Sequence, residues 1–282
     1  MDMHESRNSS ASVRRALSIL DYLSTHAGEH GLTLASLARG TQINKSTLLR
    51  LLDALREFGL VVKDPEMERY RLGLKPLQWA SACLDSMQLR SFAVPYLRHL
   101  MEASGETAHL VIYDDYQIVY VDKVECPSSI RLVSRIGGRN PLYCTAAGKA
   151  FLASLPEVIF DEVVRRGLTR RAYNTMTTPE ALREDLIRIR SCGYAIDNEE
   201  NELGVRCVGA VIFDHTGYPV AAISVSGPIT RITPDRFDDL GQVVKHMAEN
   251  ISRQLGHQVT GSPATHSTLP SATGSQKESD VA

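Results

Sequence analysis

The stretch NKSTLLRLLDALREFGLV (44–61) combines a polar first turn with an apolar helix face. Apolar side chains recur at helical spacing from position 48 onward: Leu48, Leu51, Leu52, Leu55 and Phe58. This period predicts a helix with one buried face. Short polar or basic residues occupy its first turn and exposed side: Asn44, Lys45, Ser46, Thr47 and Arg50. Asn44 is suited to cap the helix and Gly59 to end it. The helix alone does not show whether its polar end meets water or a partner.

The flanking segments predict a winged helix-turn-helix. A helix over 12–25 carries an apolar stripe of Val13, Ala16, Leu17, Leu20 and Leu23. Thr33 is suited to cap a short second helix that Gly40 ends. After the helix of 44–61, the short strands 60–63 and 68–72 form a hairpin through the turn 64–67. In such a unit the third helix inserts its N-terminal half in the major groove of DNA, and the shorter helix packs against the DNA backbone.

The domain boundaries follow from these patterns. We expect a flexible arm over 1–11, a DNA-binding domain over 12–75 and its helix-turn-helix at about 33–52. The domain holds ten Lys/Arg against seven Asp/Glu, which is a charge of +3. Because the whole chain carries −2, the remainder carries −5. This asymmetry has the sign expected if the front of the chain approaches phosphates. Candidate DNA contacts are Asn44, Lys45, Ser46, Thr47, Arg50, Arg14, Lys63, Arg69 and Arg71.

The rest of the chain predicts an α+β sensor-sized domain. Pro76 opens a linker helix over 76–88, and a second helix over 88–104 contains Pro95, which is expected to kink or divide it. Period-two segments at 107–113, 118–125 and 129–136 predict strands. Further strands are predicted for the segments GYAID, VRCVGAVIFD and YPVAAISVSG. Helices are expected at 144–155, 157–166, 179–191 and 234–256. This domain spans 89–258, and the Ser/Thr/Gly/Pro-rich tail 259–282 is expected to be disordered.

Composition places the chain in the cytoplasm. Hydrophobic content of 43% and charged content of 23% are typical of a soluble globular protein. No apolar run reaches the roughly 20 residues that cross a bilayer, and the N-terminus lacks a signal-peptide apolar region. The five cysteines are scattered and form no CxxC pair, which favours reduced thiols over disulfides or a zinc site. We therefore expect no metal, no cofactor and no membrane partner.

In the order and spacing of its motifs the chain resembles the IclR family of bacterial transcription regulators. The front matches rest on SVRRALSILDYL, STLLRLL, FGLV and RYRLG. The rear matches rest on CTAAGKAFLA, GYAIDNEENELGVRCVGAVIFD and AAISVSGP. The resemblance implies a winged helix-turn-helix, a linker helix that helps dimerise the DNA-binding heads, and a C-terminal α/β effector-binding domain related to GAF-type sensors. It also implies a dimer, or a tetramer built of two dimers, on a double-stranded DNA operator with an inverted repeat.

The resemblance also implies an effector pocket for a small organic acid. Carried over by position, the pocket residues are Ala146, Ala147, Asp197, Cys207, Ser224 and Ser226. A ligand suited to them has a carboxylate for the free N–H groups where the helix of 144–155 starts, and a hydroxyl or oxo group for the serines. The expected role is a repressor of a catabolic operon, with transcription activation as the alternative.

Each candidate also has an ordinary structural interpretation. Ser46 and Thr47 favour helix N-termini for local reasons. Asp197 is placed to cap the turn that follows it, and Cys207 alone is most often a small core residue. Glu66 and Glu68 share the hairpin with the wing cations, so the wing is expected to make few backbone contacts.

Two other classes of function fit the sequence less well. An enzyme acting through Cys207 or a serine needs a base in reach, and the nearest histidine in sequence, His215, belongs to a predicted turn. The chain also lacks a Gly-rich phosphate loop. An architectural DNA-binding protein would not need a sensor-sized rear domain of charge −5. A steep salt dependence of DNA binding would identify that class.

Overall fold

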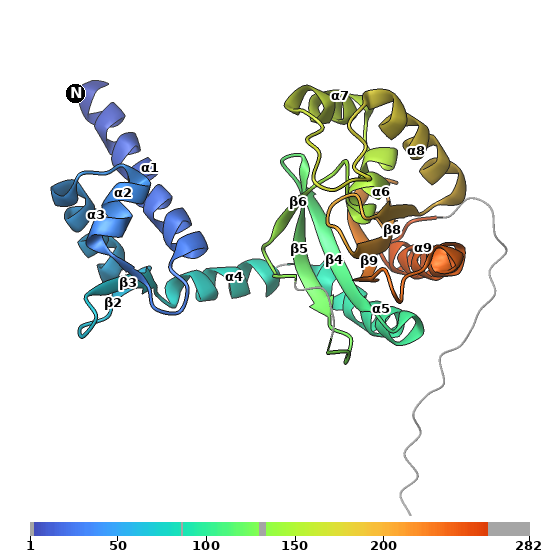
Figure 1. Ribbon diagram of the computed structural model, residues 1–282, viewed down its shortest axis with the longest axis horizontal. Helices are drawn as coiled ribbons and strands as arrows, with labels where there is room; N and C mark the ends of the chain where they lie inside the picture. Colours follow the sequence, from blue (N-terminus) through green and yellow to red (C-terminus); the bar gives the residue numbers. More distant parts are fainter. Residues whose placement is uncertain (1–2, 86, 130–133, 259–282) are drawn as a thin grey trace, which may run out of the picture. The chain divides into compact units, whose positions relative to one another are not determined.

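The computed structural model describes residues 3–85, 87–129 and 134–258, which divide into a front unit ending at Gln88 and a rear unit starting at Leu89 (Figure 1). Residues 130–133 of the predicted strand 129–136 and the whole predicted tail 259–282 lie outside the described residues.

The front unit is a winged helix-turn-helix followed by a helix. Its elements are α1 (Met3–His26), β1 (Leu32–Thr33), α2 (Leu34–Thr41), α3 (Lys45–Glu57), β2 (Val61–Lys63), β3 (Arg69–Leu72) and α4 (Lys75–Asp85). The predicted hairpin is present, and β1 extends it to an antiparallel sheet in the order β1-β3-β2. Helix α1 starts at Met3, so the predicted flexible arm over 1–11 is wrong for most of its length.

Capping side chains fix where the two short helices begin. Thr33 Oγ1 accepts a hydrogen bond from the Ser36 N–H at 3.2 Å, and Asn44 Oδ1 accepts one from the Thr47 N–H at 2.9 Å. Both caps were predicted. Helix α2 does not end at Gly40, and the missing Cβ there instead makes room for the Tyr22 ring. It ends at Thr41, and the C-cap residue Gln42 takes the left-handed conformation (φ 57°).

The buried face of the front unit differs from the predicted stripe at two places. Ile19 and Leu23 of α1 are buried, whereas Val13 and Leu17 are more than half exposed. The stripe in contact with α2 and α3 is therefore rotated around α1 from the predicted one. Leu48, Leu52 and Leu55 of α3 are buried as predicted, but Phe58 is 69% exposed because it is the C-cap residue, where the chain turns into Gly59.

Helix α4 has apolar residues but no buried side chain among those described. Leu74, just before it, is 78% exposed, and Leu77 and Trp79 are 68% and 54% exposed. Such an apolar surface is typical of a segment that packs against another chain.

The rear unit is built on a six-stranded antiparallel sheet in the order β6-β5-β4-β9-β8-β7. The strands are β4 (Thr107–Asp114), β5 (Gln117–Val124), β6 (Arg139–Pro141), β7 (Ala195–Asn198), β8 (Val205–Phe213) and β9 (Pro219–Pro228). All except β6 were predicted. Residues far apart in sequence meet at its centre, where Ser226 pairs with Thr107 on one side and with Cys207 on the other.

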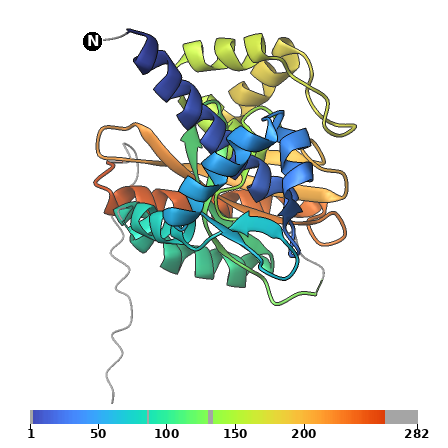
Figure 2. The same cartoon turned by 90° about the vertical axis from the view of Figure 1, so that its left-hand side faces the viewer.

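Helices cover both faces of this sheet (Figures 1 and 2). On one face lie α5 (Gln88–Ser104) and α9 (Phe237–Gln254), joined by a hydrogen bond from Gln254 Nε2 to the Tyr96 hydroxyl at 2.9 Å. On the other lie α6 (Ala146–Ser154), α7 (Glu157–Arg166) and α8 (Pro179–Cys192). A short turn of 3-10 helix, η1 (Pro234–Arg236), precedes α9. Helix α5 runs through Pro95 undivided, so of the predicted kink or division at this residue the division does not occur.

Candidate functional site

The recognition helix α3 presents a polar N-terminal turn to solvent. Asn44, Lys45, Ser46 and Arg50 are exposed and Thr47 is half-buried. The Asn44 side chain is occupied with capping, since its Oδ1 also accepts a hydrogen bond from Ser46 Oγ at 2.9 Å. Lys45 and Arg50 make no hydrogen bond or ion pair with the described residues, so both cations are open to a phosphate or a base edge. Arg14 on α1 is also exposed.

The three predicted wing cations differ in their surroundings. Lys63 forms an ion pair with Glu68, which raises its pKa, and lies over the Tyr70 ring. Arg69 Nη1 donates to the Gly31 carbonyl at 3.2 Å and so ties the wing to the loop before β1. Arg71 is exposed. Of the three, Arg71 is therefore the wing residue best placed to meet a DNA backbone.

A cavity of about 250 Å³ in the rear unit brings together all six predicted effector residues. Its walls come from α6, β5, β7, β8, β9 and the segments around them. The predicted members are Ala146, Ala147, Asp197, Cys207, Ser224 and Ser226. Sequence reasoning missed the others: Ile118, Tyr120, Ser134, Arg135, Gly138, Arg139, Asn140, Thr145, Asn201, Glu202 and Val205. Polar groups of both charges thus converge on one hollow, as in ligand sites.

The start of α6 provides backbone donors at this cavity. Thr145 Oγ1 caps the helix by accepting from the Gly148 N–H at 3.2 Å and is itself held by the Pro141 carbonyl at 2.8 Å. The first N–H groups of a helix have no partner within it, so those of Ala146 and Ala147 are available there. Gly209 of β8 allows this approach, because a Cβ at that position would lie 2.9 Å from the Ala147 nitrogen.

Asp197 both shapes the cavity and caps a turn. It is 2% exposed, and its Oδ1 accepts from the Glu200 N–H at 2.8 Å and the Asn201 N–H at 3.4 Å. Burial raises its pKa to about 6, although these N–H groups and Lys149 oppose the shift. The capping role and the cavity position are therefore compatible, and the carboxyl titrates close to neutral pH.

The two serines share one face of β9, as their spacing predicts, and His109 of β4 lies beside them. His109 Nδ1 is 3.5 Å from Ser226 Oγ, and its Nε2 is 2.8 Å from Ser134 Oγ. The ring is fully buried, which lowers its pKa to about 3 and keeps it neutral. A neutral imidazole donates through one nitrogen and accepts through the other, so His109 can hold the hydroxyls of Ser226 and Ser134 in place.

Two further groups give the cavity hydrogen-bond donors. Burial raises the pKa of Tyr120 to about 12, so its hydroxyl stays protonated, and it accepts from Asn140 Nδ2 at 3.3 Å. Arg135 is exposed and lines the cavity with no hydrogen bond or ion pair from its side chain to the described residues. Arg139 is instead held by Asp114 and Gln117. In the sequence, Arg135 and Arg139 lie on either side of Gly137 and Gly138, and this pattern is the signal from which these cavity residues could have been predicted.

A buried ion cluster lies behind the Asp197 turn. Lys149 of α6 is 1% exposed and its Nζ lies 2.5 Å from Glu200 Oε1 and 2.7 Å from Asp185 Oδ2. Burial alone would lower the pKa of Lys149, but the two carboxylates raise it. Burial raises the pKa of Glu200 to about 7 against the pull of Lys149. Its second oxygen is buried without a hydrogen-bond partner among the described residues. The Lys149 charge also acts on Asp197, so three carboxyls are electrostatically coupled to one ammonium.

The described part of the chain contains neither a cluster of metal-ligating side chains nor a membrane-spanning helix. In residues 3–85, 87–129 and 134–258, no three His, Cys, Asp or Glu side chains gather as a metal site would require. Within the same ranges, no helix is both long enough and apolar enough to cross a bilayer.

Both units match known families. Residues 12–65 match the IclR helix-turn-helix domain, and residues 81–253 match the Bacterial transcriptional regulator IclR C-terminal domain. The chain is 37% identical over 248 residues to the Transcriptional repressor IclR of Escherichia coli (strain K12), covering 87% of this chain and 90% of that one. It is 36% identical over 245 residues to the HTH-type transcriptional repressor AllR of Klebsiella pneumoniae, covering 86% and 89%.

Solved structures give the same result. The Thermotoga maritima IclR structure superposes with a TM-score of 0.73 at 38% identity and covers 88% of this chain and 100% of that one. An IclR homolog from Microbacterium hydrocarbonoxydans, complexed with 4-hydroxybenzoate, superposes with a TM-score of 0.75 over 86% of this chain and 98% of that one. At 21% identity this second likeness shows the shared fold alone.

Proposed function

This chain belongs to the IclR family of transcriptional regulators, and from that premise we propose that it represses a catabolic operon under the control of a small organic acid. The family and the relatives named as transcriptional repressors make it a DNA-binding regulator with a C-terminal effector domain and not an enzyme. One observation carries the proposal. A single cavity in the rear unit contains the six predicted effector residues, and the same chain carries an exposed recognition helix.

The chemistry of the cavity selects the class of effector. A carboxylate finds the Arg135 guanidinium and the first N–H groups of α6, both suited to anions. A neighbouring hydroxyl or oxo group finds Ser224, Ser226 and the Tyr120 hydroxyl. Asp197 is mostly ionised above pH 6 and then only accepts, so it faces a hydroxyl of the ligand. The effector is therefore a small hydroxy or oxo acid, such as a sugar acid or an aromatic hydroxy acid. The 4-hydroxybenzoate complex of the Microbacterium relative is consistent with this class.

The apolar surface of α4 supports a homodimer. Leu77 and Trp79 are exposed on a helix that buries none of its described side chains, and Val13 and Leu17 of α1 add to the exposed apolar area. A symmetric dimer presents two recognition helices, so the operator is an inverted repeat. Light scattering on the wild type and on Leu77→Glu tests the dimer, because a charge in an apolar interface weakens it. An unchanged mass in the variant would remove α4 from the interface.

Two experiments test the regulatory role. Genomic footprinting should recover an inverted repeat beside catabolic genes, and a featureless motif would contradict the proposal. A calorimetric screen of hydroxy and oxo acids should find a ligand that binds the wild type and binds the Ser224→Ala/Ser226→Ala double variant more weakly. Loss of two hydrogen bonds to a charged ligand predicts a drop of about tenfold or more. An acid that binds both proteins equally would place the effector elsewhere.

A further inference from the structure

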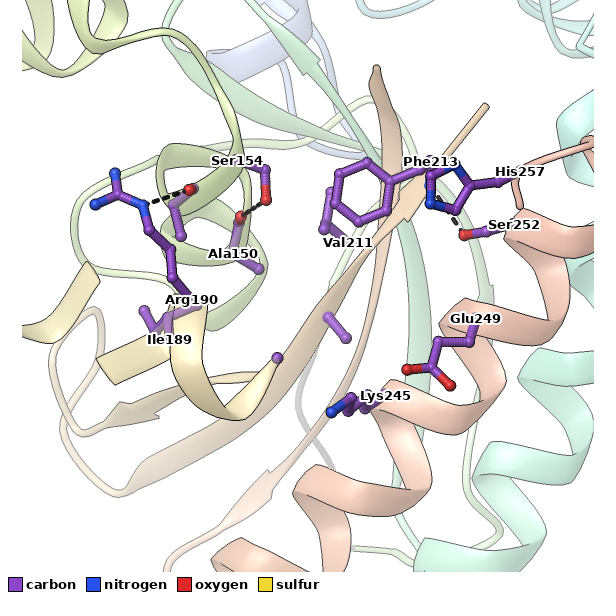
Figure 3. Close-up of a pocket in the computed structure, with 13 residues that line it drawn as sticks. Ala150, Ser154, Ile189, Arg190, Val211, Phe213, Lys245, Glu249, Ser252 and His257 are labelled. Carbon is purple, nitrogen blue, oxygen red and sulfur yellow. Dashed lines mark hydrogen bonds between the residues drawn. The ribbon is translucent and has the colours of Figure 1, made fainter. Parts of the chain in front are cut away.

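The rear unit contains a second cavity, of about 280 Å³, that shares no lining residue with the effector cavity (Figure 3). It opens between α6, α8, the end of β8 and α9. Its lining residues are Ala150, Ala153, Ser154, Ile189, Arg190, Gly193, Ala210, Val211, Phe213, Lys245, Glu249, Ser252 and His257. None of the predicted effector residues and none of the predicted DNA contacts lines this cavity.

One wall of the second cavity is a free strand edge. Strand β7 pairs with β8 only as far as Ala195 opposite Gly209, whereas β8 continues to Phe213. The Val205 carbonyl accepts from the Glu199 N–H on the β7 side, so alternate residues of β8 direct their backbone groups that way. Beyond the end of β7, the Phe213 N–H is taken by Ser252 Oγ at 2.9 Å. Val211 lies between and lines the cavity, and by the same alternation its N–H and C=O are directed to the β7 side, beyond the end of β7.

The opposite wall carries one positive and one negative charge. Lys245 and Glu249 are one turn apart on α9, and both side chains point from the helix toward β8 (Figure 3). Lys245 Nζ donates to the Cys192 carbonyl at 3.1 Å, which fixes the ammonium at the cavity wall. Glu249 is half-buried and forms no ion pair with the described residues. A ligand here therefore meets an ammonium and a carboxylate that lie one turn apart on the same helix.

The remaining surface is apolar and closed at one end by stacked rings. Ala150, Ala153 and Ile189 form its floor, and the Phe213 ring stacks on His257 with centroids 5.2 Å apart. His257 Nδ1 is held by the Asp214 carbonyl at 3.1 Å, which fixes the ring. Arg190 is committed to the Ala153 carbonyl at 2.8 Å through its Nε. An apolar side chain of moderate size thus has a place beside the two charges.

We propose that this second cavity binds an α-amino acid with an apolar side chain. The ligand carboxylate pairs with Lys245 and the Val211 N–H, its ammonium pairs with Glu249 and the Val211 carbonyl, and its side chain packs on Ile189 and Phe213. A wholly apolar ligand would bury both charges without pairing them, which is unfavourable. Ligand pockets usually enclose about 300–1,000 Å³, and this cavity of about 280 Å³ lies just below that range, which suits a ligand as small as an amino acid.

Calorimetry with matched probes tests the charge pattern. L-leucine and L-phenylalanine are titrated into the full-length wild type beside 4-methylpentanoate, which lacks the ammonium, and 3-methylbutylamine, which lacks the carboxylate. One of the two amino acids is expected to bind at least about tenfold more tightly than either single-charge probe. No binding of either amino acid, or equal binding of the acid or the amine, overturns the proposal.

Matched variants locate the site. Glu249→Gln keeps the shape and removes the charge, so it should weaken amino-acid binding by about ten- to hundredfold. Glu184→Gln changes an exposed carboxylate of α8 outside both cavities and should leave the affinity unchanged, as should Ser224→Ala/Ser226→Ala in the effector cavity. Thermal midpoints for every variant confirm folding. Equal affinity in the wild type and in folded Glu249→Gln overturns the assignment, and so does loss of binding in the effector-cavity variant.

Discussion

At the scale of residues, Asp197 and Glu200 keep their protons up to a higher pH than exposed carboxyls do. Burial raises the pKa from 3.8 to about 6 for Asp197 and from 4.5 to about 7 for Glu200. Each group therefore binds its proton more tightly in the folded chain than in the unfolded chain. By linkage this contribution to stability is complete below about pH 4 and is lost as the pH rises through 6 and 7.

This linkage predicts the effect of Glu200→Gln. The neutral amide has no proton to lose, so between pH 5 and 8 the free energy of unfolding should fall less in the variant than in the wild type, by roughly 1–3 kcal/mol. Urea unfolding at several pH values measures it, with Glu184→Gln as the exposed control. Carboxyls with lowered pKa, such as Glu162, titrate below this window. Parallel pH profiles for the wild type and Glu200→Gln would mean that Glu200 is ionised throughout.

A second residue-scale prediction concerns Arg50. It is exposed on α3, so Arg50→Ala should shift stability by less than about 0.5 kcal/mol. Operator affinity should fall by about 1–3 kcal/mol if the guanidinium reads a guanine. If it holds a phosphate, the loss should be similar on every sequence and the salt slope should drop by about one. Fluorescence anisotropy at several salt concentrations separates the two cases. Arg56→Ala, an exposed arginine paired with Asp53, is the control, and unchanged binding by Arg50→Ala would leave Arg50 a solvated residue.

At the scale of elements, the wing offers a test that separates structure from contact. Arg69 donates to the Gly31 carbonyl, so Arg69→Ala should lower the free energy of unfolding by about 0.5–1.5 kcal/mol. Arg71 is exposed two residues later, and Arg71→Ala should leave stability nearly unchanged while weakening DNA binding on all sequences alike. Chemical denaturation and anisotropy on both variants measure this contrast. If the two variants exchange these effects, the roles of the two arginines are reversed.

Most elements followed from the sequence because local signals specify them. The caps Thr33 and Asn44, the stop at Gly59 and the alternation in β8 and β9 act within a few residues. What failed depends on tertiary packing. The buried stripe of α1 was misplaced because Val13 and Leu17 are as apolar as Ile19.

The same limit applies to the candidate site. Its six predicted residues came from family positions. Tyr120, Arg135 and Asn140 reach the cavity only because β5 and β6 lie beside the strands that carry the serines. No spacing in the sequence predicts that these distant segments lie together. Their proximity follows from the order of strands in the sheet.

At the scale of the whole molecule, regulation requires a coupling free energy between effector binding in the cavity and operator binding by the front unit. We predict that the acid found by the screen changes operator affinity by about 1–3 kcal/mol, and weakens it if the protein is a repressor induced by its ligand. Reciprocity makes this prediction strict. Operator DNA must change the affinity for the acid by the same factor, because both measurements close one thermodynamic cycle.

Both arms of the cycle can be measured on the full-length protein. Anisotropy gives operator affinity with and without the acid, and calorimetry gives affinity for the acid with operator DNA or with a scrambled duplex of equal length. The two factors should agree in the wild type. In Ser224→Ala/Ser226→Ala the acid should bind weakly, so the operator affinity should stay at its ligand-free value unless the acid concentration is raised in proportion. An acid that occupies the cavity yet leaves operator affinity unchanged binds both states equally, and a ligand of that kind cannot shift the equilibrium however tightly it binds.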